Sequence, residues 1–183
     1  MTIQANLAFV FPGQGSQQIG MLADIAERWP SVRNTFAEAS EALGYDLWHL
    51  IQEGTQEALN LTENSQPALL ASSVAVWRVF CEESAVRPAL LAGHSLGEWS
   101  ALVCGGVLDF ADAIKLVRLR GRYMQEAVPV GVGSMAAIIG LADDLIENCC
   151  REAGQGDVVS AVNYNSPGQV VIAGHLAAVN RAV

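Results

Sequence analysis

Lysine is almost absent from this chain of 183 residues, in which Lys115 is the only one, and the formal net charge is −9. Proteins that bind nucleic acids present a basic surface, because contacts with phosphate groups supply much of their affinity. The scarcity of positive charge therefore argues against a nucleic-acid binder. It also disfavours attraction to an anionic membrane surface.

Long hydrophobic runs are absent as well. No stretch approaches the roughly 18 consecutive apolar residues that a transmembrane helix needs. The first residues, MTIQANLAFVFPGQG, lack the basic segment of a signal peptide, and Pro12 and Gly13 interrupt their apolar run. We therefore expect a cytoplasmic protein without a leader peptide or a membrane-spanning helix.

The four cysteines show neither a C-x-x-C spacing nor a nearby histidine pair. Cys104 and Cys149 fall in apolar helical patterns. We expect buried, reduced thiols rather than disulfides or zinc ligands. No metal site and no resident cofactor is predicted.

Residues 1–128 combine short apolar runs with longer helical patterns, which is typical of an α/β protein. Residues 7–11 form an apolar run bounded by Pro-Gly and are predicted to be a buried strand. A second buried strand is predicted at 89–93. Capping and stop signals such as Gly44, Asp109 and Pro129 delimit the helices, which are predicted at 32–43, 45–53, 66–83, 95–104 and 109–128.

Residues 129–183 have a different pattern. We predict a strand at 133–141, a helix at 142–154, a hairpin of strands at 157–165 and 169–174, and a helix from 175. This β-α-β-β-α order supplies five of the six elements of a ferredoxin-like unit. The last strand is missing and the last helix has no stop signal, so we expect the sequence to end inside a domain.

Residues 91–101 read LAGHSLGEWSA, in which Gly93, Ser95 and Gly97 fit the pattern G-x-S-x-G between a predicted strand and a predicted helix. Such a sharp turn exposes the serine hydroxyl over a helix N-terminus, which favours developing negative charge. The Leu96 backbone N–H then lies where an oxyanion donor is needed. The alternative is an ordinary tight turn with a small polar residue.

A serine hydroxyl needs a base to take its proton. His94 is the nearest histidine, but neighbouring residues on so sharp a turn project in different directions, so we expect its ring to lie beside the elbow. His49 lies in a helical stretch and reads as a satisfied or surface histidine. His175 reads as a helix cap or an exposed residue. None of the three is predicted to be the base.

The glycine-rich segment FPGQGSQ, residues 11–17, does not fit a phosphate-binding loop, because Gly13, Gly15 and Gly20 lack the G-x-G-x-x-G spacing. Its glycines let backbone N–H groups approach a small group closely. In serine acyl-transfer folds a second oxyanion donor comes from a loop after a neighbouring strand. We expect the N–H of Gln14 to be this donor; the alternative is a simple helix-entry turn.

The predicted helix 109–128 carries one arginine on its apolar side. Lys115, Arg118 and Arg122 share a side that we expect to be solvated, whereas Arg120 falls among apolar residues (Ala113, Leu116, Val117, Met124 and Ala127). A buried guanidinium must be paired. A ligand carboxylate would satisfy it; the alternative is an ion pair with an acid such as Glu98 or Asp46.

Five segments together resemble the malonyl-CoA:acyl carrier protein transacylases of bacterial fatty acid synthesis: FVFPGQGSQ, QPALL, AGHSLGEWSAL, LVRLRGRYMQEAVP and VNYNSPGQVVIAG. The resemblance extends over essentially the whole chain. It implies an α/β fold with an α/β-hydrolase-like core (residues 1–128) and an inserted ferredoxin-like subdomain (residues 129–183), both incomplete here. It also implies a ping-pong transfer of malonyl from coenzyme A to the phosphopantetheine thiol of an acyl carrier protein.

The resemblance assigns roles to individual residues. Ser95 matches the nucleophile, Gln14 and Leu96 the oxyanion-hole donors, and Arg120 the residue that binds the malonyl carboxylate. Gln66 and Asn165 match residues that line the substrate pocket. The family's catalytic histidine is expected after Val183, and this chain alone is expected to be inactive.

Coenzyme A and phosphopantetheine are parts of the substrates rather than cofactors. The full-length enzyme is expected to be a cytoplasmic monomer whose partner is acyl carrier protein, without nucleic acid or membrane. Two other interpretations stay open: a serine hydrolase such as a thioesterase, and an inactive piece.

Overall fold

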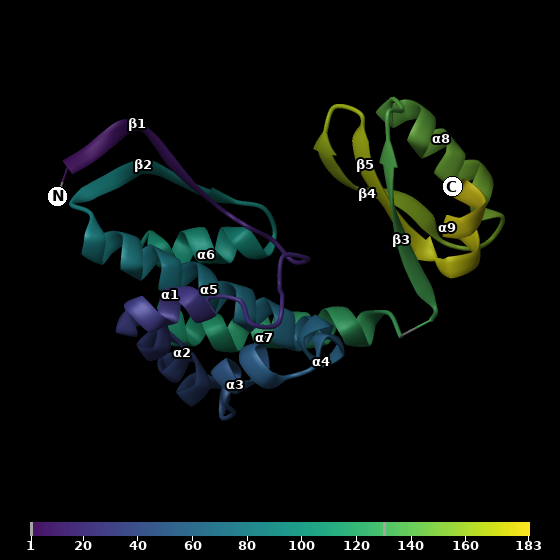
Figure 1. Cartoon of the computed structure of the whole chain (residues 1–183). Helices are drawn as coiled ribbons and strands as arrows, with labels where there is room; N and C mark the ends of the chain where they lie inside the picture. The colour runs from purple at the N-terminus through teal and green to yellow at the C-terminus, as the bar shows by residue number, and fades with distance from the viewer. Residues whose placement is uncertain (1, 130) are drawn as a thin grey trace. The chain divides into compact units, whose positions relative to one another are not determined.

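The computed structural model describes residues 2–129 and 131–183, and the chain divides into two compact units, Met1–Gln125 and Glu126–Val183 (Figure 1). The division falls near the end of a long helix, α7 (Phe110–Ala127). The boundary expected from the sequence lies three residues later, after 128. Each unit has its own hydrophobic core.

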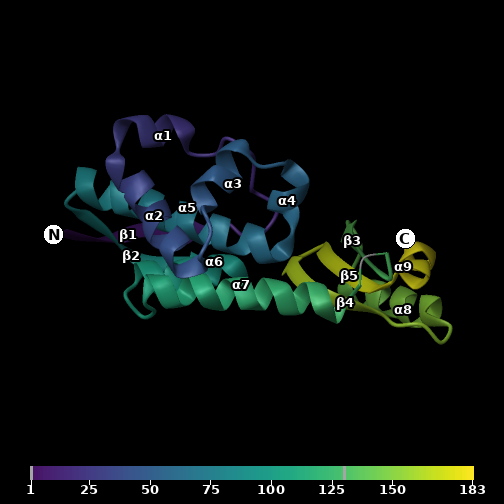
Figure 2. The same cartoon turned by 90° about the horizontal axis from the view of Figure 1, so that it is seen from below.

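The first unit is built on a parallel pair of strands, β1 (Thr2–Phe11) and β2 (Val86–Gly93). In their register Phe11 is opposite Gly93, so both strands end at the same edge. The helices gather on one face of this pair (Figures 1 and 2). They are α1 (Ala23–Arg28), α2 (Pro30–Leu43), α3 (Leu47–Glu53), α4 (Gln56–Asn60), α5 (Thr62–Glu83), α6 (Leu96–Cys104) and α7.

The predicted order of strands and helices in this unit is confirmed, but several boundaries differ. The expectation that both strands are buried is wrong, since only one face of the pair is covered by helices among the described residues and Val10 and Leu90 are 75% and 67% exposed. The strand predicted at 7–11 begins at Thr2, and the helix predicted at 66–83 begins at Thr62. Pro67 therefore lies inside α5 rather than in its first turn, where proline is best tolerated. The short helices α1 and α4 have too few residues to show a helical period.

The core of the first unit is formed mainly by α2, α5 and α7. Their apolar faces bury Phe36, Leu70 and Ile114 completely. Removing such a side chain from water contributes about 1.5–3 kcal/mol. These contacts fix α5 and α7, the helices that carry Gln66 and Arg120.

A close crossing joins α7 to the start of α5. A Cβ atom added at Gly121 would lie 2.4 Å from the carbonyl oxygen of Thr62. Any other residue would therefore force the two backbones apart. Because Gly121 follows Arg120, this crossing determines where Arg120 lies beside α5.

The second unit is a three-stranded antiparallel sheet in the order β3-β5-β4. Its strands are β3 (Gly133–Ile139), β4 (Val159–Ser166) and β5 (Gln169–His175), and its helices are α8 (Asp143–Gly154) and α9 (Leu176–Ala182). Ile146 of α8 and Val179 of α9 pack in one core with Val170 and Ile172 of β5, so both helices cover the same face. The predicted β-α-β-β-α order is confirmed.

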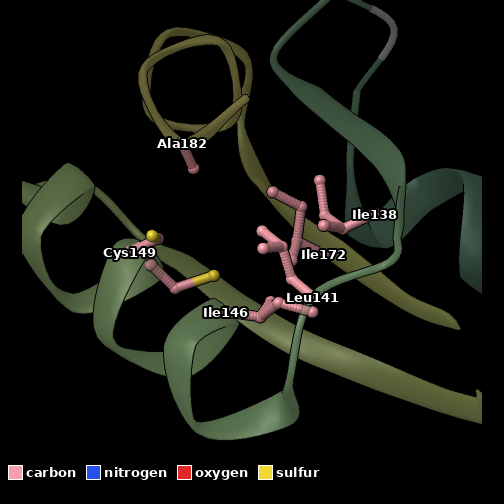
Figure 3. A pocket seen from close by; sticks show the side chains of 7 residues that line it. Ile138, Leu141, Ile146, Cys149, Ile172 and Ala182 are labelled. Atoms are coloured by element: carbon pink, nitrogen blue, oxygen red, sulfur yellow. The ribbon is translucent and has the colours of Figure 1, made fainter. Parts of the chain in front are cut away.

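A small apolar hollow lies between these two helices and the sheet (Figure 3). Its volume of about 20 Å³ is enough for roughly one water molecule. The residues that line it are Ile138, Leu141, Ile146, Cys149, Cys150, Ile172 and Ala182. This hollow is therefore too small to hold an organic ligand.

All four cysteines are free thiols, but the expectation that they are buried is only partly correct. Cys150 is buried, and burial raises the pKa of its thiol. Cys104 is half-buried, and burial raises its pKa to about 12. Cys149 is exposed, because it lies on the solvent side of α8, whereas its neighbour Cys150 faces the core.

The crossing at Gly121 leads to a prediction. Gly121→Ala should lower the free energy of unfolding by about 1–3 kcal/mol, because the added methyl group overpacks a backbone contact. Urea unfolding followed by circular dichroism measures this change. The matched control is Gly154→Ala, where the added Cβ meets nothing within 4 Å; alanine there should be neutral or stabilise by up to about 1 kcal/mol. Equal stability of Gly121→Ala and the unsubstituted chain would contradict the close crossing.

Candidate active site

Ser95 occupies the sharp turn that connects β2 to α6. Its backbone has φ 55° and ψ −108°, a conformation that costs about 1–3 kcal/mol for a residue with a side chain. The N–H of Gly97 closes the turn by donating to the His94 carbonyl at 3.0 Å. The side chain of Ser95 is exposed. The strained, exposed serine predicted from G-x-S-x-G is therefore present.

The two flanking glycines make this turn possible. A Cβ atom at Gly93 would lie 2.1 Å from the carbonyl carbon of Gly97, and one at Gly97 would lie 2.3 Å from the carbonyl oxygen of Phe11. Three backbone segments thus meet where a single methyl group could not fit. The prediction that glycines allow strand and helix to cross closely is confirmed.

Two backbone N–H groups are available beside this turn. Leu96 is the first residue of α6, where N–H groups lack helical partners. Gln14 lies in the loop after β1, and a Cβ at neighbouring Gly13 would lie 3.4 Å from the His94 carbonyl oxygen. Among residues 2–129 and 131–183, no acceptor receives a hydrogen bond from the N–H of Gln14 or Leu96. Both groups can therefore donate to a ligand.

Arg120 reaches the serine directly. Its Nη2 donates to Ser95 Oγ at 2.9 Å, and its Nη1 donates to Gln66 Oε1 at 2.8 Å. Gln66 is fully buried. Its Nε2 donates to the sulfur of Met124 at 3.3 Å. The structure thus brings together Ser95, Arg120 and Gln66, and contact with Gln66 holds one side of the guanidinium.

The predicted surroundings of Arg120 need correction. Its side chain is partly exposed, because the buried stripe of α7 runs through other positions: Phe110, Ala113, Ile114, Val117 and Gly121. Leu116 and Met124, expected on the buried side, are 45% and 47% exposed. The alternative ion pair is not observed: in the described part of the chain, Arg120 contacts neither Glu98 nor Asp46. A guanidinium that is open to solvent and has no acid partner can bind the carboxylate of a ligand by donating hydrogen bonds to it.

The other basic side of α7 is solvated, as predicted, but Arg118 also has a structural role. It donates to the Leu43 carbonyl at 3.1 Å and lies over the ring of Tyr45 at 5.1 Å. Lys115 lies 3.8 Å from Asp112. Lys115 and Arg118 line a polar hollow of about 260 Å³. Arg118 therefore stabilises the C-terminal end of α2.

No histidine side chain of the first unit contacts the serine among the residues that the structure describes. His94 is exposed, and its ring makes no hydrogen bond to Ser95. His49 is exposed and lies 3.9 Å from Glu53. His175 is the N-cap residue of α9, and its Nδ1 accepts a hydrogen bond from a backbone N–H at 3.2 Å. The base for Ser95 is not found among these contacts.

Asn165, the remaining candidate, belongs to the second unit. It lies in β4 between Tyr164 and Ser166, where the pairing with β5 shifts by one residue. Its side chain is exposed. A bulge of this kind turns a side chain out of the regular strand pattern. Its role in substrate binding stays a prediction.

Sequence reasoning missed the polar side chains that hold the Gln14 loop. Gln17 Nε2 and Gln56 Nε2 both donate to Asn60 Oδ1, each at 2.9 Å. Ser16 Oγ donates to the Gly13 carbonyl at 3.0 Å. The only signal in the sequence is the concentration of polar side chains around the glycines, which does not identify their partners.

Neither a metal centre nor a membrane segment emerges from the described residues. They include no cluster of three or more His, Cys, Asp or Glu side chains that could hold a metal ion. None of the helices that they form is long and apolar enough to cross a membrane. The features brought together at the site are a strained serine, two available N–H groups and a guanidinium.

Known proteins are similar to this chain over nearly its whole length. A model of the acyl transferase domain family matches residues 8–183. The malonyl CoA-acyl carrier protein transacylase of Escherichia coli K12 is 65% identical over 177 residues, which are 97% of this chain and 57% of that protein. Its counterpart in Bacillus subtilis 168 is 50% identical over 171 residues, 93% of this chain and 54% of that protein. The chain thus spans little more than half the length of these curated relatives.

Solved structures are similar over the same extent. The malonyl-CoA:acyl carrier protein transacylase FabD of Xanthomonas oryzae has a TM-score of 0.94 and 58% identity, covering 100% of this chain and 58% of that one. A malonyl-transacylase solved in complex with a type II polyketide synthase acyl-carrier protein has a TM-score of 0.91 and 60% identity, with the same coverage. The expected α/β class agrees with these likenesses.

The buried contact between Gln66 and Arg120 leads to a prediction. Gln66→Leu keeps the volume but removes the acceptor of Arg120 Nη1, so the free energy of unfolding should fall by about 1–3 kcal/mol. Urea unfolding checks this value. Met124→Leu is the control, because it preserves volume and removes only a weak sulfur acceptor; it should cost less than about 1.5 kcal/mol. The interpretation fails if the two variants are equally stable.

Proposed function

The chain belongs to the acyl transferase domain family, and on this premise we propose that the protein carrying it transfers a malonyl group from coenzyme A to the phosphopantetheine thiol of an acyl carrier protein. The observation that carries the proposal is the hydrogen bond between Arg120 and Ser95, made beside two available backbone N–H groups. This arrangement joins a nucleophile, an oxyanion site and a carboxylate-binding group. The transfer supplies extender units for fatty acid synthesis.

In the first half-reaction, Ser95 Oγ attacks the thioester carbonyl of malonyl-CoA. The N–H groups of Gln14 and Leu96 donate to the oxygen that becomes negatively charged, which is the largest electrostatic contribution in acyl transfer. The C–S bond then breaks, and the thiol of coenzyme A leaves with a proton. The product is a malonyl ester on Ser95.

In the second half-reaction, the phosphopantetheine thiol attacks this ester and the serine hydroxyl is restored. Both halves need a group that accepts and returns the serine proton. The resemblance implies a histidine after Val183 for this role. The complete activity is accordingly proposed for the longer protein rather than for these 183 residues alone.

Arg120 selects the acyl group. Its guanidinium presents N–H donors in a planar fork that matches a carboxylate. Gln66 holds Nη1 from the buried side, while Nη2 reaches the nucleophile. A malonyl carboxylate bound here would lie near Ser95, with its thioester carbon within reach of the hydroxyl. An acyl group without a carboxylate gains nothing from this contact.

The finer fold assignment and the partners are part of the same proposal. Residues 1–128 would belong to an α/β-hydrolase-like core and residues 129–183 to a ferredoxin-like subdomain, in which Asn165 lines the substrate pocket. The β-α-β-β-α order of the second unit supports this assignment. Acyl carrier protein is the proposed partner of a cytoplasmic monomer that binds neither nucleic acid nor membrane and needs no cofactor.

The first test concerns the acceptor. Mixing the longer protein with malonyl-CoA should add one malonyl group to Ser95, detected by mass spectrometry, and adding holo-acyl carrier protein should remove it. Ser95→Ala should stay unmodified. Rapid release of free malonate without carrier protein would contradict the transferase and favour a thioesterase. An unmodified serine in folded protein would contradict both enzymes.

The second test concerns selection of the acyl group. Arg120→Ala should lower kcat/KM for malonyl-CoA at least about 100-fold, as expected when a charge-assisted contact is lost. Its kcat/KM for acetyl-CoA should change far less. Lys115→Ala removes a cation from the same helix and is the control; it should leave both values unchanged. If Arg120→Ala keeps its preference for malonyl-CoA, Arg120 does not bind the carboxylate.

A further inference from the structure

The loop between β1 and α1 carries the Gln14 N–H on a flexible backbone. Gly13, Gly15 and Gly20 lie within eight residues of it, and Gly15 and Gly20 have φ of 108° and 82°. Glycine adopts such conformations readily, but it also has more alternatives to lose than any other residue. A donor on this backbone is useful only if other groups fix its direction.

Side chains fix the two peptide planes on either side of Gln14. The hydroxyl of Ser16 donates to the Gly13 carbonyl at 3.0 Å. In a trans peptide the C=O and the following N–H point in opposite directions, so this bond determines where the Gln14 N–H points. The next plane is fixed by Gln17, whose Oε1 accepts from the Gly15 N–H at 2.9 Å.

A second set of bonds ties Gln17 to α4. Asn60 Oδ1 accepts from Gln17 Nε2 and from Gln56 Nε2, each at 2.9 Å. Gln56 Oε1 in turn accepts from the Ile19 N–H at 3.3 Å. Thus the side-chain oxygen of Asn60 holds both glutamines. Gln17 in turn binds the backbone of the loop at Gly15, and Gln56 binds it at Ile19.

We propose that Ser16, Gln17 and Asn60 are positioning residues that aim the Gln14 N–H at the oxyanion formed on the substrate of Ser95. This inference rests on the proposed function and concerns the same site. None of the three makes a hydrogen bond to Ser95 in the part of the chain that the structure describes. They act by holding the donor in place before the reaction, which is the condition under which an oxyanion donor lowers the barrier.

The contacts of Asn60 allow two matched variants to be compared. Both bonds to Asn60 use Oδ1 as the acceptor, so Asn60→Asp keeps them, whereas Asn60→Leu has a similar shape and no acceptor. Glu57→Gln is the control on the same helix, because Glu57 is exposed and takes no part in these bonds. Ser16→Ala removes the more direct bond to the Gly13 carbonyl.

The experiment measures the single-turnover rate of Ser95 acylation by malonyl-CoA in the longer protein. Asn60→Leu and Ser16→Ala should lower the maximal rate about tenfold, a fraction of the 10²–10³ lost when an oxyanion donor is removed. The malonyl-CoA concentration that gives half the maximal rate should stay the same. Asn60→Asp and Glu57→Gln should react within about twofold of the unsubstituted protein, since a hydrogen bond to a charged acceptor is at least as strong.

Hydrogen exchange of the loop amides at 13–20 provides a readout that does not depend on activity. Exchange should be faster in Asn60→Leu than in Asn60→Asp, while the urea midpoints of the two variants agree. The inference would be overturned if Asn60→Leu acylated Ser95 at the rate of the unsubstituted protein, or if Asn60→Leu and Asn60→Asp lowered that rate equally. Either result would leave the proposed function intact. Failure of the unsubstituted protein to acylate Ser95 would overturn both.

Discussion

The parallel pairing of β1 and β2 is the constraint on which the rest of the site depends. Its register brings Phe11 opposite Gly93, so the loop with Gln14 and the turn with Ser95 leave the sheet at the same edge. The carbonyl oxygen of Phe11 then limits Gly97 to a residue without Cβ. A shift of one residue would separate the loop from the serine and turn each side chain of the strand to the other face. The pairing thus determines how close the Gln14 N–H lies to Ser95.

A second requirement is met by α5 and α7, which carry Gln66 and Arg120, the residues proposed to bind the acyl group. Gly121 lets the helices approach closely, and Gln66 on α5 then lies within hydrogen-bond distance of Arg120 on α7. Arg120 is partly exposed, so it keeps a hydrated, charged group available without the large cost of burying it. Gln66 is fully buried and holds one end of the guanidinium. The position of Arg120 therefore depends on helix packing, while the position of Ser95 depends on strand pairing.

Much of this arrangement could be predicted from the sequence, and the errors have physical reasons. The elbow at Ser95 was predictable because its glycines, strand and helix are adjacent in the sequence. The exposure of Arg120 could not be predicted, because a helical repeat gives the direction of a side chain but not what the helix packs against. The helix α5 begins four residues before the predicted start, because Asn64 and Ser65, which were expected to precede the helix, lie in its first turn. The link from Gln17 to Asn60 spans 43 residues and has no periodic signal.

The proposed oxyanion donors at Gln14 and Leu96 belong to peptide bonds, whereas the proposed carboxylate-binding group, Arg120, is a side chain. A point mutation can replace a guanidinium, but it cannot delete a backbone N–H except by introducing proline. In the proposed function, the chemistry of acyl transfer and the choice of acyl group are consequently separable. Substitutions on α5 and α7 can give new acyl preferences to an elbow whose geometry they do not alter, so the same scaffold can be adapted to other thioesters one side chain at a time.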